Sequence, residues 1–282
     1  MGAFVISVAN RKGGTGKTTT AVHLAAGLAQ IGRTVLLIDF DTLGHSGHAL
    51  GVAPERGAGN AHEASGDADA LVRAIRPTRI KGLDLVPANR SRGTDARAAE
   101  PLSLARSLSA PGIASRYDVI VIDTAPSYDG DMVMALAASD AVLVPFVPHP
   151  LALDGIRQFS KIFLMIRMRL NPGLRHFGLT ACQFNPQSAV HRSITAAVSR
   201  EFGADKLLGS IRSDIRLAEC AGTGKTAYEF ASGCRGAADY RSLVSMVAAR
   251  WMPPAAMPAA SAENPAGSGQ TARPFALLLR AS

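Results

Sequence analysis

The chain has few cysteines and no long apolar run. Only three of its 282 residues are cysteine, an odd number without a Cys-x-x-Cys pair, which excludes a disulfide framework and argues against a cysteine-built metal site. No apolar run approaches the roughly 18 residues that span a membrane. The first residues lack the charged, apolar and small-residue segments of a secretory signal. We therefore expect a reducing, cytoplasmic setting.

Charged residues are scarce as well, at 18%, whereas 47% are apolar, which is typical of a globular protein. The formal net charge is +8, and its excess lies in one region. Residues 151–250 hold 14 Lys and Arg against 7 Asp and Glu, whereas residues 1–150 hold 14 of each. A local cationic surface favours a polyanionic partner, either nucleic acid or an acidic lipid surface. A solvated basic face without a partner is the alternative.

Short apolar runs rich in β-branched residues alternate with helical patterns. Buried strands are predicted over residues 4–8, 34–38, 83–86, 118–122, 141–145, 177–184 and 207–211. Helices are predicted over residues 18–31, 153–170, 190–202 and 238–251. Strands without polar alternation, separated by helices, are typical of parallel sheets. The predicted fold class is therefore α/β, with a mostly parallel central sheet covered by helices on both faces.

Two segments differ in composition from the rest. Residues 44–70 are rich in Gly, Ala and small polar residues and predict a surface excursion with one short helix. Its histidines, at 45, 48 and 62, are expected to be exposed loop residues rather than metal ligands. From residue 252 onward Pro, Ala, Ser and Gly dominate, and such a segment cannot bury enough apolar area to offset its ordering entropy. We predict one domain over 1–251 and a disordered tail over 252–282.

The strongest motif follows the first predicted strand. Residues 12–19 read Lys-Gly-Gly-Thr-Gly-Lys-Thr-Thr and open the helix that begins near Thr18. In such a P-loop the glycines let successive backbone N–H groups converge on phosphate oxygens, and the helix N-terminus adds positive partial charge. Lys17 is expected to reach the β- and γ-phosphates, and the Thr18 hydroxyl to bind Mg²⁺. The candidate nucleotide-binding residues of this loop are Gly13, Gly14, Thr15, Gly16, Lys17, Thr18 and Thr19.

Three aspartates, Asp39, Asp41 and Asp123, stand at the ends of predicted strands. Ligands of an open parallel sheet bind beyond the carboxyl ends of the strands, so these side chains should face the P-loop. Asp123 is expected to hold Mg²⁺ through water, and Asp39 or Asp41 to orient an attacking water. The candidate metal-binding residues are Thr18, Asp39 and Asp123. Each aspartate alone could instead be a helix cap.

These segments resemble the ParA/MinD family of deviant Walker A ATPases, and within it the ParA partition proteins, from about residue 4 to residue 250. Residues 12–19 are similar to the deviant P-loop, residues 37–41 to the second aspartate motif and residues 117–127 to the Walker B segment. The resemblance implies ATP and Mg²⁺ as cofactors and an ATP-sandwich homodimer. In it, Lys12 would contact the partner subunit's nucleotide and Asp41 would serve the hydrolytic water. The candidate catalytic residues are thus Lys12, Lys17 and Asp41.

Two further stretches are similar to ParA proteins in particular. Residues 144–155 resemble the segment whose backbone helps to hold the adenine, which makes Pro148 a candidate nucleotide contact. Residues 211–219, followed by 236–240, resemble the family's C-terminal block, whose arginines help to bind DNA without sequence preference. The candidate DNA-binding residues are Arg212 and Arg216. Arg192 is a further candidate, near the position where some relatives place another DNA-contacting arginine.

The chain departs from the family pattern in places. After Asp41 it has Thr42-Leu43-Gly44-His45 where the family usually has Pro-Gln-Gly-Asn, so the coupling of hydrolysis to the dimer can differ. Residues 222–226, Gly-Thr-Gly-Lys-Thr, resemble a second Walker sequence but follow no predicted strand, and we expect no nucleotide there. The P-loop begins almost at Met1, so we expect no N-terminal helix-turn-helix domain and no operator recognition.

The resemblance implies a cytoplasmic, nucleoid-associated ATPase that positions a plasmid, a chromosome or another cargo. ATP would close the dimer, the dimer would bind double-stranded DNA non-specifically, and a ParB-like or cargo-adaptor protein would stimulate hydrolysis and release. A MinD-like membrane-cycling ATPase is one alternative, disfavoured because the apolar residues 274–280 make a poor amphipathic anchor. A metabolic enzyme, such as an ATP-dependent amide synthetase, is the other.

Overall fold

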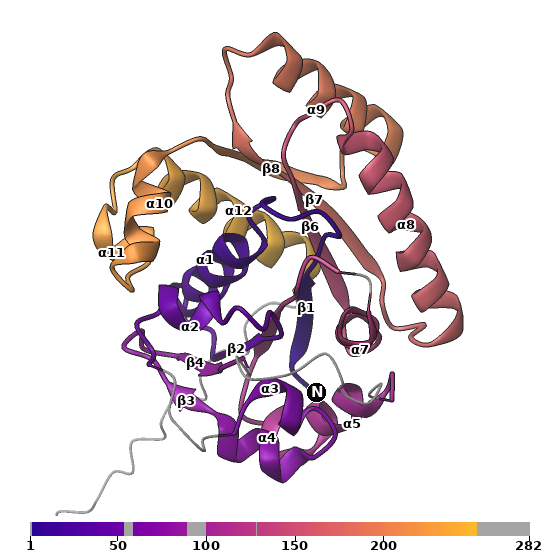
Figure 1. Cartoon of the computed structure of the whole chain (residues 1–282), viewed down its shortest axis with the longest axis vertical. Helices are drawn as coiled ribbons and strands as arrows, with labels where there is room; N and C mark the ends of the chain where they lie inside the picture. Colours follow the sequence, from indigo (N-terminus) through magenta and orange to yellow (C-terminus); the bar gives the residue numbers. More distant parts are fainter. Residues whose placement is uncertain (1, 54–58, 89–99, 128, 253–282) are drawn as a thin grey trace, which may run out of the picture.

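The central element of the fold is a single sheet. The computed structural model describes residues 2–53, 59–88, 100–127 and 129–252, and within them eight strands form one sheet in the order β3-β4-β2-β5-β1-β6-β7-β8 (Figure 1). Neighbouring strands are parallel except for β3, which pairs antiparallel with β4 at the sheet edge. The strand bounds are β1 Phe4–Val8, β2 Val35–Asp39, β3 Arg76–Pro77, β4 Leu83–Val86, β5 Val119–Asp123, β6 Ala141–Phe146, β7 His176–Phe184 and β8 Leu207–Arg212.

Helices connect most of the strands. Their bounds are α1 Lys17–Gln30, α2 His45–Ala49, α3 Ala61–Ala64, α4 Ala68–Ala74, α5 Ser103–Ser109, α6 Pro111–Ala114, α7 Gly130–Ala137, α8 Ala152–Arg169, α9 Ala189–Phe202, α10 Ile215–Gly222, α11 Ala227–Phe230 and α12 Arg235–Trp251. The predicted α/β fold class is confirmed, and each of the seven predicted strands is present with ends shifted by at most one residue. Strand β3 was missed because two residues, one of them proline, carry no periodic signal.

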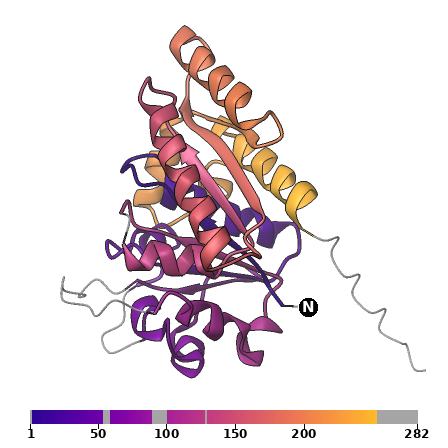
Figure 2. The ribbon, with the colours of Figure 1, turned by 90° about the vertical axis from the view of Figure 1, so that its right-hand side faces the viewer.

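The sheet is covered on both faces, as Figures 1 and 2 show. Side chains of consecutive strand residues point to opposite faces. In β1, Ile6 and Val8 join a core with α1 and α12, whereas Val5 joins a second core with α4, α5 and α7. A third core lies under α7, α8 and α9, against β6 and β7. Apolar burial on both faces explains why the strands read as continuous hydrophobic runs rather than alternating ones.

The register of β2 against β5 places two carboxylates side by side. Asp39 and Asp123 are opposite each other at the carboxyl ends of these strands. At the amino ends, Asp118 accepts hydrogen bonds from the backbone N–H and the hydroxyl of Thr34, at 2.8 and 2.9 Å from Oδ2. The Asp118 N–H in turn donates to the Thr34 hydroxyl at 3.0 Å. A polar contact therefore joins the two strands where each begins.

A buried histidine connects the P-loop helix to the C-terminal helices. Nδ1 of His23 on α1 lies 2.7 Å from the carbonyl oxygen of Thr19, and Nε2 accepts the N–H of Ala227 at 3.0 Å. The imidazole also stacks on the ring of Tyr240 in α12, with centroids 4.6 Å apart. Burial lowers the pKa of His23 to about 4, so the ring is neutral at pH 7 and donates from Nδ1.

The segment from residue 44 to residue 70 differs from our prediction. It contains α2, α3 and the first residues of α4 rather than one short helix, and it contributes Leu50 and Ala61 to the cores. His45 and His48 are exposed, as predicted, but they lie in α2 rather than in a loop. The prediction was wrong for His62, whose side chain is 2% exposed, with Nε2 3.4 Å from a carboxylate oxygen of Asp131. Composition alone suggested a loop, because small residues give no periodic apolar signal.

Helix α12 ends at Trp251, which is the last residue of the domain that we predicted. Helix α12 begins at Arg235, three residues earlier than predicted, because Cys234 caps it by accepting the N–H of Ala237. Met252, which we assigned to the tail, is buried against the core. The remainder of the predicted tail, 253–282, lies outside the described residues. No helix in the described ranges is both long and apolar enough to traverse a bilayer.

Candidate functional site

The predicted P-loop joins β1 to α1, at the carboxyl edge of the sheet. Two of its glycines have left-handed backbone torsions, with φ of +70° at Gly14 and +86° at Gly16. Residues with a Cβ rarely adopt such torsions, which explains the glycines there. Gly16 is the N-cap of α1, and its carbonyl accepts the first intrahelical hydrogen bond, from Thr20 at 2.8 Å. The loop therefore leads directly into a helix N-terminus, which is the arrangement that binds phosphate.

Two side chains that we had not assigned to the site hold this loop in place. Asn10 is buried; its amide donates to the carbonyl of Pro145 at 2.8 Å, and its Oδ1 accepts the N–H of Lys12 at 3.0 Å. From β7, the Gln183 amide donates to the carbonyl of Gly14 at 3.1 Å, and Gln183 itself has a φ of +52°. The position of Asn10 just before the motif was the available signal. Nothing in the sequence pointed to Gln183, which lies 169 residues from Gly14.

Lys17 is the buried cation of the site. Its side chain lies under the loop, and Nζ donates to the carbonyl of Lys12 at 3.3 Å. Burial lowers the pKa of Lys17, while the negative charges of Asp123 and Asp41 oppose that shift. The two carboxylates favour the charged form of this desolvated lysine, and a charged ammonium group binds phosphate strongly.

Asp39 and Asp123 are both completely buried, and the charge of Asp123 acts on Lys17. Asp39 accepts backbone N–H groups with both oxygens, from Asp41 at 3.0 Å and from Ser46 at 3.1 Å. Oδ2 of Asp123 accepts the Ser46 hydroxyl at 2.9 Å. Burial raises the pKa of each carboxyl group above its usual value. The hydroxyls of Thr18 and Ser46 oppose this rise at Asp123, and the charge of Asp123 adds to it at Asp39.

The oxygens of Asp123 fit a magnesium site. Oδ1 of Asp123 is buried and has no hydrogen-bond partner among the described residues. It can therefore accept a hydrogen bond from a metal-bound water. No cluster of three or more His, Cys, Asp or Glu side chains in the described ranges could hold a metal ion. Mg²⁺ does not require one, because it binds through one or two carboxylates together with phosphates. Asp123 suits this role better than Asp39, whose oxygens both already accept backbone N–H groups.

Asp41 and Lys12 lie on the two segments that border the site. Asp41 is buried, and its Oδ1 accepts the N–H of Leu43 at 3.0 Å. Lys12 is exposed, and within the described residues its ammonium group makes no ion pair or hydrogen bond. An exposed, unpaired lysine at the mouth of a phosphate-binding loop can contact a group outside its own subunit. Pro148 is buried in the connection between β6 and α8, one strand away from β1.

The three predicted DNA-binding arginines lie near the carboxyl ends of β7 and β8. Arg212, the last residue of β8, pairs in register with Phe184 of β7, and its guanidinium donates two hydrogen bonds to Asp239 of α12, from Nη2 at 2.7 Å and from Nε at 2.9 Å. Arg216 on α10 donates to Glu219 at 2.8 Å and is 54% exposed. Arg192 on α9 is also exposed and donates to the carbonyl of Pro186. Arg212 therefore ties β8 to α12, whereas Arg216 and Arg192 face solvent.

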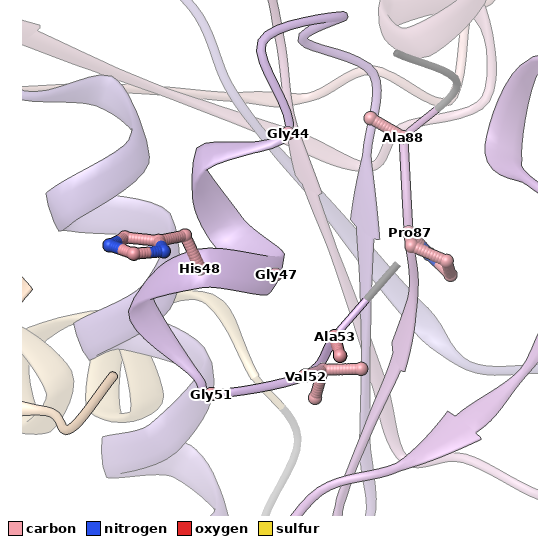
Figure 3. A pocket seen from close by; sticks show the side chains of 8 residues that line it. All are labelled: Gly44, Gly47, His48, Gly51, Val52, Ala53, Pro87 and Ala88. Carbon is pink, nitrogen blue, oxygen red and sulfur yellow. The ribbon is translucent and has the colours of Figure 1, made fainter. Parts of the chain in front are cut away.

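Two hollows flank the short helix α2, which follows Asp41. The first, of about 310 Å³, lies between α2 and the segment after β4. Figure 3 shows Gly47 on the side of α2 that faces Pro87, and the His48 ring on the opposite side. The second, of about 280 Å³, is bordered by α1, α2 and α10. The first hollow contains no residue of the P-loop, so it is not the phosphate site.

Comparison with known proteins agrees with this geometry. Residues 3–176 match the family described as "AAA domain". The chain is 35% identical to the chromosome-partitioning ATPase Soj of Thermus thermophilus over 87% of its own length and 95% of that protein. It is 30% identical to the chromosome partitioning protein ParA of Caulobacter vibrioides, over 87% and 94% of the two chains.

A similar solved structure is cobyrinic acid a,c-diamide synthase from Mycobacterium smegmatis, determined with a bound ATP analog and magnesium. It superposes with a TM-score of 0.75 at 28% identity, covering 88% of this chain and 96% of that one. The resemblance found in the sequence is therefore confirmed, and with it the P-loop fold. From its deviant P-loop, its paired strand-end carboxylates and its extensive similarity to Soj and ParA, we conclude that the chain belongs to the ParA/MinD family of P-loop ATPases.

Proposed function

We propose that the protein is an ATP-dependent partition or cargo-positioning ATPase whose ATP-bound dimer holds DNA without sequence preference. The observation that carries this proposal is the convergence of the P-loop with Lys17, Asp41 and Asp123 at one edge of the sheet. Relatives at 30–35% identity over most of the chain are named chromosome-partitioning ATPase Soj and chromosome partitioning protein ParA, which supports the same conclusion.

In this proposal ATP lies with its phosphates on the P-loop residues 13–19 and its adenine near Pro148. Lys17 binds the phosphate oxygens, and Thr18 and Asp123 would hold Mg²⁺, Asp123 through water. Bound Mg²⁺ supplies charge neutralisation for the transferred phosphoryl group. Asp41 orients the attacking water, for which hydrogen-bond geometry is the main requirement.

Lys12 is proposed to join two subunits. Its ammonium group is exposed and unpaired within the described residues, so each subunit can offer it to the triphosphate of the other. Phosphate charge would attract it across the interface, and loss of the γ-phosphate on hydrolysis would weaken that contact. Hydrolysis, stimulated by a ParB-like or cargo-adaptor partner, would then return the protein to monomers that release the DNA.

The test is the molar mass in solution by light scattering, with a non-hydrolysable ATP analogue and Mg²⁺. The wild type should be a dimer, and Lys12→Ala should stay monomeric although it binds the analogue. Arg11→Ala is the matched control, because Arg11 is the neighbouring exposed cation and should leave the dimer intact. A wild type that remains monomeric with bound analogue would contradict the proposal.

DNA binding is proposed for the exposed arginines at the carboxyl ends of β7 and β8. Arg216 and Arg192 both present guanidinium groups to solvent there, in the half of the chain with the excess of positive charge. Binding to duplex phosphates should weaken steeply with salt and depend little on sequence. Retention on DNA that does not change between 50 and 200 mM salt would argue against this surface.

A second candidate function is ATP-dependent amide synthesis, which the similarity to the diamide synthase favours. The two functions differ in their need for an acceptor. A partition ATPase forms ADP and phosphate from ATP alone, faster with DNA and partner. An amide synthetase shows little turnover until its carboxylate and nitrogen substrates are added. Phosphate release from ATP alone, with and without DNA, separates them.

A further inference from the structure

Ser46, the second residue of α2, contacts both buried carboxylates of the site. Its hydroxyl donates to Oδ2 of Asp123 at 2.9 Å, and its backbone N–H donates to Oδ2 of Asp39 at 3.1 Å. Ser46 is completely buried, so water does not compete for either contact. One residue thus connects the start of α2 to the ends of β2 and β5.

The Thr18 hydroxyl interacts with the carboxylate of Asp123 as well, but the Ser46 hydroxyl is the group that meets one of its oxygens at hydrogen-bond distance. It occupies Oδ2, while Oδ1 has no hydrogen-bond partner among the described residues. A carboxylate held through one oxygen presents the other in a fixed direction, which is how a neighbouring hydrogen bond orients a metal-binding group. Without the hydroxyl, Asp123 could turn toward Lys17, whose charge already interacts with it.

The other end of α2 contacts the C-terminal helices through two glycines. Gly51 and Gly224 have φ values of +67° and +66°, and a Cβ added at Gly224 would lie only 3.0 Å from the Cα of Gly51. Gly224 belongs to the Gly-Thr-Gly-Lys-Thr segment, which joins α10 to α11. This segment, which resembles a Walker sequence, therefore serves as a close backbone contact with the end of α2.

An arginine reinforces this second contact. Arg79 donates from Nη1 to the carbonyl of Leu50 at 2.6 Å and forms a two-point ion pair with Glu229 of α11, at 2.7 and 3.0 Å. Glu229 also accepts the N–H and hydroxyl of Thr226, which closes the capping box at the start of α11. The end of α2 and the start of α11 are thus bridged by a single guanidinium group.

Between these two ends α2 contacts α1, α10 and β2, and Ser46 and Gly47 are buried. The helix is flanked by hollows of about 310 and 280 Å³, and glycines with left-handed torsions, Gly44 and Gly51, lie at its two ends. A short element that borders open space and has glycines with left-handed torsions at its two ends can shift as a unit.

We propose that Ser46 is a positioning residue for Asp123 and that α2 transmits the state of this carboxylate to α10 and α11. The inference rests on the proposed function, because it assigns a role toward bound nucleotide and Mg²⁺. It adds two features to that function. Ser46 at one end of α2 positions Asp123, and the contact of Gly51 with Gly224 at the other end connects α2 to the segment between α10 and α11. Since α10 carries Arg216, the route leads to the proposed DNA surface.

The first experiment measures the Mg²⁺ concentration that half-saturates binding of a non-hydrolysable ATP analogue to the full chain. Ser46→Ala should raise it about 10-fold, the low end of the effect of removing a residue that orients a metal-binding group. High Mg²⁺ should restore full binding, which a folding defect would not allow. Ser139→Ala is the matched control, because Ser139 is equally buried but its hydroxyl contacts Ser7 and Ala135, away from the site. An unchanged half-saturation in Ser46→Ala would overturn the positioning role.

The second experiment measures amide hydrogen exchange of residues 45–49 and 215–222 with and without the analogue and Mg²⁺. In the wild type both segments should exchange at least about 5-fold more slowly with nucleotide. Gly224→Ala should keep the response of residues 45–49 and lose that of residues 215–222. Gly222→Ala is the matched control, since a Cβ there meets no atom within 4 Å. An undiminished response of residues 215–222 in Gly224→Ala would overturn the transmission.

If Gly224→Ala does not fold, Arg79→Ala tests the same link. It removes the bridge from Leu50 to Glu229, whereas Arg106→Ala removes an exposed two-point ion pair with Glu100 elsewhere. Neither experiment uses DNA. A wild type that binds nucleotide but not DNA would therefore refute only the DNA-binding part of the proposed function. The two experiments above would still decide the roles of Ser46 and α2. A wild type that binds no nucleotide would refute both.

Discussion

The phosphate site and the outer arginine region are built in opposite ways. The phosphate site uses buried groups: Lys17, Asp39 and Asp123 are at most 6% exposed, and their partners are mostly backbone atoms and one serine. The arginine region around β8 uses exposed side chains that pair with neighbouring carboxylates, as Arg212 does with Asp239. A contiguous motif therefore identified the first region well. The charge count does not show which cations of the second region pair with carboxylates.

The largest expected effect concerns the buried cation. Lys17→Ala should weaken binding of an ATP analogue at least about 100-fold, because a charge-assisted contact to the phosphates is lost from a buried position. Isothermal titration with Mg²⁺ measures it. The control is Lys161→Ala on the exposed face of α8, which should bind normally. Equal affinity in both variants would mean that the site does not depend on buried charge.

The next effect separates chemistry from binding within the phosphate site. Asp41→Asn keeps an oxygen that can accept the Leu43 N–H but removes the carboxylate that orients water. Turnover should fall roughly 100-fold, the usual contribution of a positioned acid or base, while analogue binding and the dimer persist. Phosphate release and light scattering on one sample provide both readings. The exposed Asp69→Asn should change neither, and a parallel loss of binding and turnover would assign Asp41 to structure instead.

A pH effect tests how firmly the P-loop helix is joined to the C-terminal helices. His23 is neutral in the folded protein, with its pKa lowered from 6.5 to about 4 by burial, so unfolding takes up a proton between these values. The stabilisation that the neutral His23 contributes is therefore complete above pH 6.5. As the pH falls toward 4, the free energy of unfolding decreases by about 3 kcal/mol, because each pKa unit corresponds to about 1.4 kcal/mol. Urea unfolding of the nucleotide-free protein at pH 7 and pH 4.5 measures it.

The control for this titration is a histidine in a different environment. His23→Gln should lower stability at pH 7 but flatten the fall toward acid, whereas the exposed His45→Gln should retain the wild-type slope. A wild-type slope in His23→Gln would mean that other buried groups cause the acid sensitivity.

The smallest expected effect distinguishes the arginines. Arg216→Ala should weaken ATP-dependent DNA binding about 10-fold and reduce the salt slope by about 1 for each lost phosphate contact, without lowering the melting temperature. Arg212→Ala should lower the melting temperature, because it breaks the link from β8 to Asp239 on α12. Fluorescence anisotropy with a labelled duplex and thermal unfolding make the comparison. If Arg212→Ala alone weakened DNA binding, the two roles would be exchanged.

Sequence reasoning predicted the fold and the candidate phosphate site for a physical reason. Strands buried on both faces appear as apolar runs, and a P-loop keeps its glycines, Lys17 and Thr18 within eight consecutive residues. The aspartates could be assigned to the site because the carboxyl ends of parallel strands share one edge. Each of these inferences needs only local spacing or a general property of sheets.

The contacts that sequence reasoning missed join distant segments. Gln183 reaches Gly14 across 169 residues, and Ser46 reaches Asp123 across 77. Ser46 lay in a segment that we interpreted as a surface excursion, because its neighbours are small and aperiodic. The ion pair of Arg212 with Asp239 was missed for a related reason, since a net charge does not reveal which charges are paired.

The hydrogen bonds between Thr34 and Asp118 have a consequence for folding fidelity. Both faces of β2 and β5 are apolar, so sliding one strand past the other by a residue would still leave hydrocarbon against hydrocarbon, and burial alone discriminates poorly against the slip. Thr34 and Asp118, which precede the two strands, form hydrogen bonds that a pair of strands in a shifted register cannot make. The correct juxtaposition of Asp39 and Asp123 is thereby secured at the opposite end of the sheet, before any ligand arrives.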